Sequence, residues 1–481
     1  MATAQQADLP RLACSANPMP APGIVHLGVG AFFRAHVAIY VADAMRASGG
    51  DWGVVGVSLQ NPTMRDRLAP QGFAYTALEL GPAGETPRVV EVLQDVLVAR
   101  ENPEAVLTVM ADPRIRIVTL TVTEKGYCHE PATGRLNLQH PDIVHDVSAP
   151  LPVSALGFLV RALERRRRAG ISPFTVLTCD NLPENGAMVR GVVLELARAI
   201  DPALAEWIAA EGRFPATMVD RIVPATKAED LDRLAAATGR FDASPVMCEP
   251  FSQWVVEDNF VGGARPDLGA VGVQLVEDVK PFENMKLRML NGTHFALAYL
   301  GYLAGHETIA DAVADADFVR FVRHLWKAEI IPTLDTPPGE NLPLYAETLL
   351  ARYSNPAIRH RTWQIAMDGS QKLPQRILGT LADNLKAGRP SPGLMLTVAA
   401  WMRYVGGIDE AGRPIEVKDP LAPRLRALSD SASDATGKAG ALLSVHEIFD
   451  PALAELMLPG VAAAYARLCD FGARTAIGDI R

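Results

Sequence analysis

Cysteine is scarce in this chain, with five residues among 481, and no two of them lie close together. The five are Cys14, Cys128, Cys179, Cys248 and Cys469. An odd number without a CxxC pair fits neither a disulfide framework nor a zinc knuckle. We therefore expect a reduced protein with buried thiols and no metal site.

Positive charge is also in short supply, because 46 Lys and Arg residues face 55 Asp and Glu residues and the formal net charge is −9. Without a basic surplus to neutralise phosphates, nucleic acid is excluded as the main partner. The longest apolar run, Phe295 to Ala304, is far too short to span a bilayer, and Met1 to Asp8 lack the pattern of a signal peptide. We expect a cytoplasmic protein, a monomer or small homo-oligomer, with a small-molecule partner and no membrane partner.

Hydrophobic residues, in contrast, make up 49% of the chain, and its length exceeds one ordinary core. Strand and helix patterns alternate as far as Lys280, which predicts a parallel, doubly wound sheet, and long helical patterns follow Pro281. We expect an α/β fold, with a Rossmann-type dinucleotide-binding domain over residues 1–280 and a mainly α-helical substrate and catalytic domain over residues 281–481. The expected strands are 24–27, 52–59, 115–122, 174–178, 246–260 and 271–279, and helices are expected at 37–45 and 153–170.

A glycine turn follows the first expected strand and precedes a helix, which is the context that a dinucleotide-binding βαβ unit requires. Glycines let the backbone approach a pyrophosphate at a helix N-terminus. The GxGxxG pattern is incomplete because Phe33 occupies its third glycine position, so a tight structural turn is the alternative. The cofactor contacts expected here are Gly28, Gly30, Ala31, Phe32, Phe33 and Arg34.

Later strands of the same sheet are also followed by polar residues. Glu124 and Lys125 follow one strand and Asn181 follows another, at the carboxyl ends where such sheets bind ligands. We expect Glu124 and Lys125 to contact the cofactor, with a capping or turn role as the alternative for each position.

The cofactor itself is expected to be NAD, with NADP not excluded. The second strand ends in Ser58-Leu59-Gln60-Asn61, without the acidic residue that usually contacts the ribose of NAD, and Arg65 and Arg67 follow shortly. These residue types leave the choice open.

The stretch from Pro281 to His294 predicts a helix with a chemically unusual side. At about 100° per residue, Glu283, Lys286, Asn291 and His294 fall on one side of a helix otherwise rich in Met, Leu and Phe. A lysine shielded from water can serve as a base near neutral pH, and an asparagine N–H can hold a carbonyl or alkoxide oxygen. Gly292 lies among them, which usually marks close approach by another backbone or a ligand. A solvated polar edge is the alternative.

These motifs resemble those of the long-chain polyol dehydrogenases, the mannitol dehydrogenase family. The resemblance covers most of the chain and rests on Lys286-x4-Asn291-x2-His294, Gly28-x-Gly30-x-Phe32-x-Arg34-Ala35-His36, Thr121-Val122-Thr123-Glu124-Lys125-Gly126-Tyr127, Cys179-Asp180-Asn181 and Thr217-Met218-Val219-Asp220-Arg221-Ile222-Val223-Pro224. Phe33 departs from the pattern, since many members have His there. Within the family, residues 248–260 and 359–372 are similar to the fructuronate reductase (D-mannonate oxidoreductase) group.

The resemblance implies a metal-independent, nicotinamide-dependent oxidoreductase (EC 1.1.1 class) that interconverts a sugar-derived secondary alcohol and a ketone. It implies that Lys286 is the base, that Asn181 and Asn291 hold the oxyanion, that His294 orients the substrate and that Glu283 relays the proton to water. Candidates for binding the rest of the substrate are Asp220, Arg361 and Lys372, with structural ion pairs as the alternative.

The expected substrate pair is D-mannonate and D-fructuronate, because the 359–372 segment supplies cations for a carboxylate. Mannitol 2-dehydrogenase or a sorbitol or arabinitol dehydrogenase is the alternative, and the sequence does not decide the chain length of the substrate. A zinc-dependent dehydrogenase would need clusters of Cys or His ligands, and the wide cysteine spacing speaks against them. A short-chain dehydrogenase would need Tyr-x3-Lys, and the nearest match pairs Tyr302 with His306. A non-catalytic nucleotide-sensing protein would not need Lys286.

Overall fold

The computed structural model describes residues 9–15, 19–130 and 133–480. The chain forms two compact units, Met1–Lys280 and Pro281–Arg481. Each unit has its own secondary structure, and the two are described in turn.

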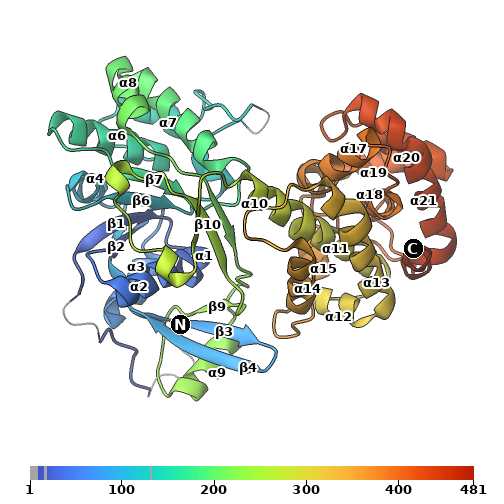
Figure 1. The fold of residues 1–481 in the computed structure, drawn as a ribbon, viewed down its shortest axis with the longest axis horizontal. Coiled ribbons are helices and arrows are strands. Elements are labelled where there is room, and N and C mark those ends of the chain that lie inside the picture. Colours follow the sequence, from blue (N-terminus) through green and yellow to red (C-terminus); the bar gives the residue numbers. More distant parts are fainter. Residues whose placement is uncertain (1–8, 16–18, 131–132, 481) are drawn as a thin grey trace. The chain divides into compact units, whose positions relative to one another are not determined.

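The first unit is built on a five-stranded sheet of order β5-β2-β1-β6-β7, in which every neighbouring pair is parallel (Figure 1). Its strands are β1 (Pro22–Leu27), β2 (Gly53–Ser58), β5 (Leu93–Val98), β6 (Ile117–Leu120) and β7 (Thr175–Thr178). The helices between and after these strands are α1 (Ala31–Ala35), α2 (Val37–Ser48), α3 (Thr63–Leu68), α4 (Pro103–Ala111), α5 (Pro141–Ser148), α6 (Ala155–Arg168), α7 (Asn185–Ile200), α8 (Pro202–Glu211) and α9 (Ala228–Thr238).

Alternate residues of the sheet pack on opposite faces. On β1, Val25 and Leu27 belong to a core shared with α4, α6 and α7, whereas Ile24 belongs to a core shared with α1 and α2. Strands buried on both faces read as continuous apolar runs, which is what residues 24–27 show. The predicted Rossmann-type, doubly wound architecture is confirmed.

Two smaller sheets complete the first unit. They have the orders β11-β10-β8 and β4-β3-β9. Their strands are β3 (Tyr75–Gly81), β4 (Gly84–Val90), β8 (Thr217–Asp220), β9 (Val246–Cys248), β10 (Gln253–Glu257) and β11 (Gln274–Val276). The single strand expected at 246–260 is wrong, because the segment divides into β9 and β10, which lie in different sheets. The break falls at Glu249 and Pro250. The Glu249 side chain accepts a hydrogen bond from the Ile222 N–H, and Pro250 has no N–H to donate to a strand ladder.

The second unit is mainly helical, as predicted, and its described residues form no strand beyond isolated bridges such as the one between Ile408 and Pro414. The stretch with the predicted catalytic residues comprises α10 (Lys280–Met285), the π-helix η5 (Lys286–Gly292) and α11 (Thr293–Leu303). The remaining longer elements are α13 (Ala316–His324), the π-helix η6 (Leu325–Ile330), α14 (Leu342–Tyr353), α15 (Thr362–Ile365), α16 (Gly369–Leu373), the π-helix η8 (Pro374–Leu378), α17 (Gly379–Lys386), α18 (Pro392–Val405), α19 (Ala422–Asp430), α20 (Ala435–Leu443) and α21 (Pro451–Gly478).

Helix α21 is long and apolar enough, by length and composition alone, to cross a membrane. It contains Pro459 and a break at Gly472, where φ is +77°. Its inner face buries Met457, Val461 and Tyr465, and it packs along α18 and α20. These contacts are those of a structural helix within the second unit.

Candidate active site

The turn after β1 is shaped by two glycines with different reasons for being glycine. Gly28 has φ of +98°, and a Cβ there would lie 2.1 Å from the backbone oxygen of Thr121. Gly30 is exposed and caps α1, and a Cβ there would meet nothing closer than 3.9 Å. Gly28 is therefore required by the fold, whereas Gly30 leaves open space in which a ligand phosphate can approach the backbone.

His26, which sequence reasoning passed over, fixes this turn from below. Its Nε2 donates to the Gly28 carbonyl at 2.9 Å, and its Nδ1 accepts from the Thr119 hydroxyl at 2.7 Å. The Thr121 hydroxyl donates to the same Gly28 carbonyl at 2.8 Å. The ring of Phe33 stacks on His26 with centroids 3.6 Å apart, so this residue fills the third glycine position by packing on the strand.

Burial lowers the pKa of His26 to about 3, so the imidazole is neutral in the folded protein. In the unfolded chain its pKa returns to the ordinary value near 6.5, and protons then favour unfolding as the pH falls below that value. We expect wild type to lose about 2 kcal/mol more unfolding free energy than His26→Gln between pH 7 and pH 5. Urea titrations of both proteins at the two pH values measure this difference, and equal losses would contradict it.

Three other predicted cofactor contacts lie in α1. The buried guanidinium of Arg34 donates to the Ser244 carbonyl at 2.5 Å and lies over the ring of Tyr75. Phe32 and Ala31 are half-buried in the first turn of α1, and Phe32 stacks on His36. Packing thus accounts for Arg34, while Ala31 and Phe32 stay beside the open turn.

The loop after β6 carries Glu124 and Lys125, both exposed, in a short 3-10 turn. Asp180, at the end of β7, holds this loop by accepting the N–H groups of Val122 and Thr123 at 2.9 and 3.1 Å. The Tyr127 hydroxyl donates to the same carboxylate at 2.6 Å. Burial raises the pKa of Asp180, and the hydrogen bonds from these three donors offset only part of that rise. Asp180 therefore positions the candidate cofactor loop.

Asn181 is exposed directly after β7, as the sequence predicts for a residue at the carboxyl end of a strand. Asn185, four residues later, is buried and joins β7 to β8 through hydrogen bonds with the Asp180 carbonyl and with the backbone of Thr217. Asp220 is the last residue of β8 and is buried. The next residue, Arg221, donates to the Glu249 and Ala35 carbonyls and pairs with Glu79, so it is a structural cation.

The stretch that carries the predicted catalytic residues is not the regular α-helix that the sequence predicts. Residues Lys286–Gly292 form a π-helix between α10 and α11. In an α-helix, residues five apart lie about 140° from each other around the axis. In a π-helix the repeat is i to i+5, so Lys286 and Asn291 lie on the same side. Such segments occur frequently at functional sites.

Side chains from neighbouring helices satisfy the carbonyls of this π-helix. Trp326 donates its indole N–H to the Met289 carbonyl at 3.0 Å, and Tyr353 donates its hydroxyl to the Leu290 carbonyl at 2.8 Å. The predicted close approach at Gly292 is confirmed, because a Cβ there would lie 2.8 Å from the backbone oxygen of Arg376. A residue with a side chain at 292 would push these elements apart.

The four predicted catalytic side chains of this stretch are sheltered to different degrees. Lys286 and His294 are each 8% exposed, and Glu283 and Asn291 are half-buried. Glu283 lies one turn before Lys286, and His294 lies one turn after Asn291. The four therefore follow one another along a single helical segment in which Lys286 is shielded from water.

His294 lies among aromatic rings that the sequence did not single out. It stacks on Tyr353 with centroids 5.2 Å apart and meets His360 edge-on at 4.6 Å. Burial lowers the pKa of His294 well below its ordinary value, and the nearby His360, Arg376 and Arg352 lower it further. Burial also lowers the pKa of His360 to about 4. Both imidazoles are neutral, as a hydrogen-bonding, orienting role requires.

The two predicted substrate-binding cations of the second unit differ in their surroundings. Arg361 is about one-third exposed and pairs with Glu307 at 2.7 Å, so its charge is already neutralised. Lys372 is half-buried and donates to the Met367 carbonyl at 2.5 Å, and Asp368 lies 3.9 Å away. Burial lowers the pKa of Lys372.

Among the described residues, one group has the chemistry of a metal site. The ligand atoms of Cys128, His140 and Asp142 lie within 4.8 Å of one another in the first unit. Burial raises the pKa of the Cys128 thiol to about 11, which opposes formation of the thiolate that a metal needs. The three residues are spread over 15 positions of sequence, which is why spacing did not reveal them.

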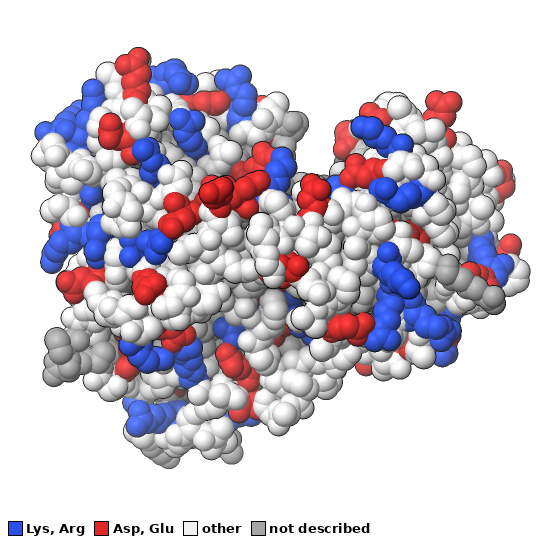
Figure 2. Space-filling model, in the orientation of Figure 1, with Lys and Arg blue, Asp and Glu red and all other residues white. Residues whose placement is uncertain are grey.

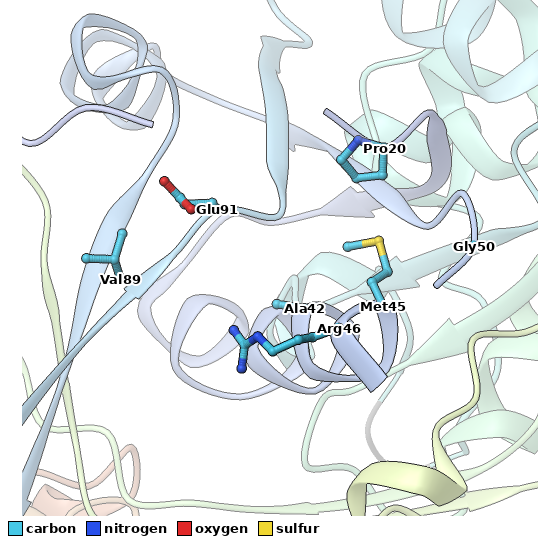
Figure 3. Close-up of a pocket in the computed structure, with 7 residues that line it drawn as sticks. All are labelled: Pro20, Ala42, Met45, Arg46, Gly50, Val89 and Glu91. Carbon is cyan, nitrogen blue, oxygen red and sulfur yellow. The ribbon is translucent and has the colours of Figure 1, made fainter. Parts of the chain in front are cut away.

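A cavity of about 330 Å³ opens in the first unit beside the C-terminal half of α2 (Figure 3). In Figure 3, Ala42, Met45 and Arg46 come from α2 and Val89 comes from β4. The remaining lining residues are Pro20, Gly50 and Glu91. Pro20 and Gly50 come just before the N-terminal ends of β1 and β2, so this cavity lies at the edge opposite to the carboxyl ends of the strands. No predicted site residue lines it.

Figure 2 shows how charge is distributed on the face that it presents. Basic and acidic side chains are interspersed with uncharged residues on both units, and acidic groups gather on parts of the first unit.

Comparisons with known proteins agree with this arrangement of elements. Residues 22–269 match the mannitol dehydrogenase Rossmann domain, and residues 278–469 match the mannitol dehydrogenase C-terminal domain. The chain belongs to the mannitol dehydrogenase family. It is a dehydrogenase that acts on CH–OH groups, which confirms the family and the enzyme class predicted from the motifs.

Individual relatives span nearly the whole chain. D-mannonate oxidoreductase of Escherichia coli (strain K12) is 46% identical over 461 residues, which are 94% of each chain. Mannitol 2-dehydrogenase of Pyricularia oryzae is 41% identical over 436 residues, covering 89% of this chain and 86% of the relative. The solved structure of Pseudomonas fluorescens mannitol 2-dehydrogenase in a ternary complex with NAD and D-mannitol is 38% identical, with a TM-score of 0.84 over 98% of this chain and 97% of that one.

Proposed function

We propose that the protein is a metal-independent, NAD-dependent oxidoreductase that interconverts D-mannonate and D-fructuronate. The observation that carries the chemistry is the π-helix that sets Lys286 and Asn291 on one side, with Lys286 sheltered from water. The similarity to D-mannonate oxidoreductase supports the substrate. The second candidate is mannitol 2-dehydrogenase, supported by the relatives of that name.

In the direction of alcohol oxidation, Lys286 takes the proton from the reacting hydroxyl. Asn181 and Asn291 donate hydrogen bonds to the oxygen as negative charge develops on it, which lowers the barrier without a Lewis acid. Neutral His294 donates or accepts a hydrogen bond that orients the substrate, and Glu283 passes the proton from Lys286 to water. A nicotinamide bound to the first unit would supply or accept the hydride.

The residues around Gly28 and Gly30 fit a dinucleotide. The space beside exposed Gly30 admits a pyrophosphate, and the carbonyl of Gly28 is turned into the protein by His26 and Thr121. Arg65, which follows β2, is already paired with Asp66 and Glu101. This pairing reduces the positive charge available to a 2′-phosphate and supports NAD over NADP, as does the NAD bound in the Pseudomonas fluorescens relative.

The proposed substrate contacts are Asp220, Arg361 and Lys372, and Glu124 and Lys125 complete the proposed cofactor contacts. We also propose a cytoplasmic protein, monomeric or in a small homo-oligomer, that works on small molecules.

A substrate screen tests the function. Fructuronate, tagaturonate, fructose and xylulose are offered with NADH and with NADPH, each with and without EDTA. We expect kcat/KM for fructuronate to exceed that for fructose at least about a hundredfold, the scale of one charge-assisted contact. EDTA should change nothing. A higher kcat/KM for fructose than for fructuronate would instead support the second candidate, mannitol 2-dehydrogenase. Loss of activity in EDTA that added zinc restores would contradict metal independence.

A further inference from the structure

Arg376 lies on a segment that packs against the helix carrying the candidate catalytic residues. It belongs to η8, and its backbone oxygen is the atom that a Cβ on Gly292 would approach. Its guanidinium lies over the ring of Phe295, 5.8 Å from the centroid. Phe295 directly follows His294, and the positive charge of Arg376 is close enough to lower the pKa of His294. Arg376 therefore borders the surface on which His294 is placed.

This guanidinium lacks an anion. Among the described residues, Arg376 has no ion pair and no side-chain hydrogen bond, and burial lowers its pKa to about 10. The other arginines of the second unit illustrate the contrast: Arg323 pairs with Glu347, Arg361 with Glu307 and Arg288 with Asp383. No carboxylate is among the causes that shift the pKa of Arg376: burial lowers this pKa and the Tyr299 hydroxyl raises it.

The nearest charged groups increase the need for an anion. Lys372 is close enough for Arg376 to lower its pKa, and it sits one turn earlier in the same helical run. A half-buried cation without an anion costs free energy, and the positive charge of Lys372 nearby adds to that cost for Arg376. A planar guanidinium is suited to bind a carboxylate with two parallel hydrogen bonds. The arrangement matches a ligand that brings its own carboxylate.

We propose that Arg376 is a specificity-determining residue that binds the carboxylate of a sugar-acid substrate. This inference rests on the proposed function and names the side chain that separates D-fructuronate from neutral ketoses. It differs from the prediction made from sequence, which offered the cations of the 359–372 segment, Arg361 and Lys372 among them, for the carboxylate.

The test compares Arg376→Met, Arg376→Lys and Arg361→Met, with Arg323→Met as the matched control in an exposed ion pair of the same unit. Kinetics with fructuronate and fructose are measured for each, together with the dissociation constant of NADH. Arg376→Met should lower kcat/KM for fructuronate at least about a hundredfold, mostly through KM, and leave fructose within about threefold. Arg376→Lys keeps the charge but loses the paired N–H donors of the guanidinium. Its kcat/KM should therefore fall about tenfold for fructuronate and stay unchanged for fructose. It serves as the test should Arg376→Met not fold.

Each other outcome overturns the inference in a recognisable way. Equal losses with both substrates would make Arg376 a structural residue. Weaker NADH binding with unchanged fructuronate kinetics would assign the anion to a cofactor phosphate. Loss of fructuronate preference in Arg361→Met but not in Arg376→Met would restore the assignment from sequence. In all three cases wild type still prefers fructuronate, whereas a wild type that prefers fructose overturns the proposed substrate itself.

Discussion

Replacement of Lys286 by alanine is expected to lower kcat for ketone reduction at least about a thousandfold, within the range attributed to a general acid–base group. NADH should bind almost as it does to wild type, because the lysine acts on the substrate oxygen. The 8% exposure of Lys286 supports this expectation, since an amine shielded from water is the kind that can release and take up a proton near neutral pH. Stopped-flow measurement of hydride transfer and a fluorescence titration of NADH separate the two effects.

Lys280→Ala is the matched control for this experiment. Lys280 lies six residues earlier at the start of α10, is exposed and pairs with Glu184, so its removal should change kcat by less than about twofold. Added primary amines should restore part of the activity of Lys286→Ala and none to other variants. Retention of more than about a tenth of wild-type kcat, a loss below about 1.4 kcal/mol, would remove Lys286 from the role of base.

Asn291→Ala is expected to reduce kcat several hundredfold, which is the usual effect of removing one hydrogen-bond donor to an oxyanion. The reason is that the amide N–H acts on charge that develops only in the transition state, so KM should change little. Asn291→Asp should be worse than Asn291→Ala, because a carboxylate repels the developing oxyanion. Steady-state kinetics of wild type, Asn291→Ala and Asn291→Asp measure whether kcat falls in that order.

Asn284→Ala provides the comparison, because Asn284 is a half-buried amide of α10 in the same segment with no proposed role. It should keep kcat within about twofold. A change confined to KM in Asn291→Ala would mean that Asn291 binds the ground state and does not stabilise the oxyanion. Asn181→Ala should reproduce the kcat effect, and additive losses in the double variant would indicate two independent donors.

Much of the fold followed from local patterns. Apolar runs at 24–27 and 174–178, with glycine or polar residues directly after them, predicted buried strands of a parallel sheet, and β1 and β7 confirm both. The switch to long helical patterns after Pro281 predicted a helical second half. These features are local, because strand and helix periodicities depend on a few neighbouring residues.

Other features required partners far away in sequence. The division of 246–260 into two strands depends on Glu249, which bonds the backbone of Ile222, and no local pattern reveals that partner. The π-helix is another case. Two of its carbonyls accept hydrogen bonds from Trp326 and Tyr353, which lie about 35 to 65 residues further along the chain, so the helical wheel drawn for an α-helix misplaced Asn291.

The candidate site shows the same division. The catalytic, cofactor and substrate residues named from the motifs remain predictions, and the structure adds residues that position them. His26 holds the glycine turn, Asp180 holds the loop of Glu124 and Lys125, and Tyr353 holds the π-helix and stacks on His294. Each acts through a hydrogen bond or ring contact across the fold, which composition and spacing do not encode.

The sequence by itself determined the family, the doubly wound sheet and the order of chemical groups along the segment from Glu283 to His294, since order and periodicity are properties of the chain. Only the tertiary structure decided which charges are already neutralised. Arg361 and Arg376 are both arginines in one short segment, yet one meets Glu307 and the other meets an aromatic ring. The free energy of a charge depends on the burial and the partners that folding brings to it. For this reason the sequence offered Arg361 and Lys372 as candidate cations for the carboxylate, whereas the proposal drawn from the structure names Arg376.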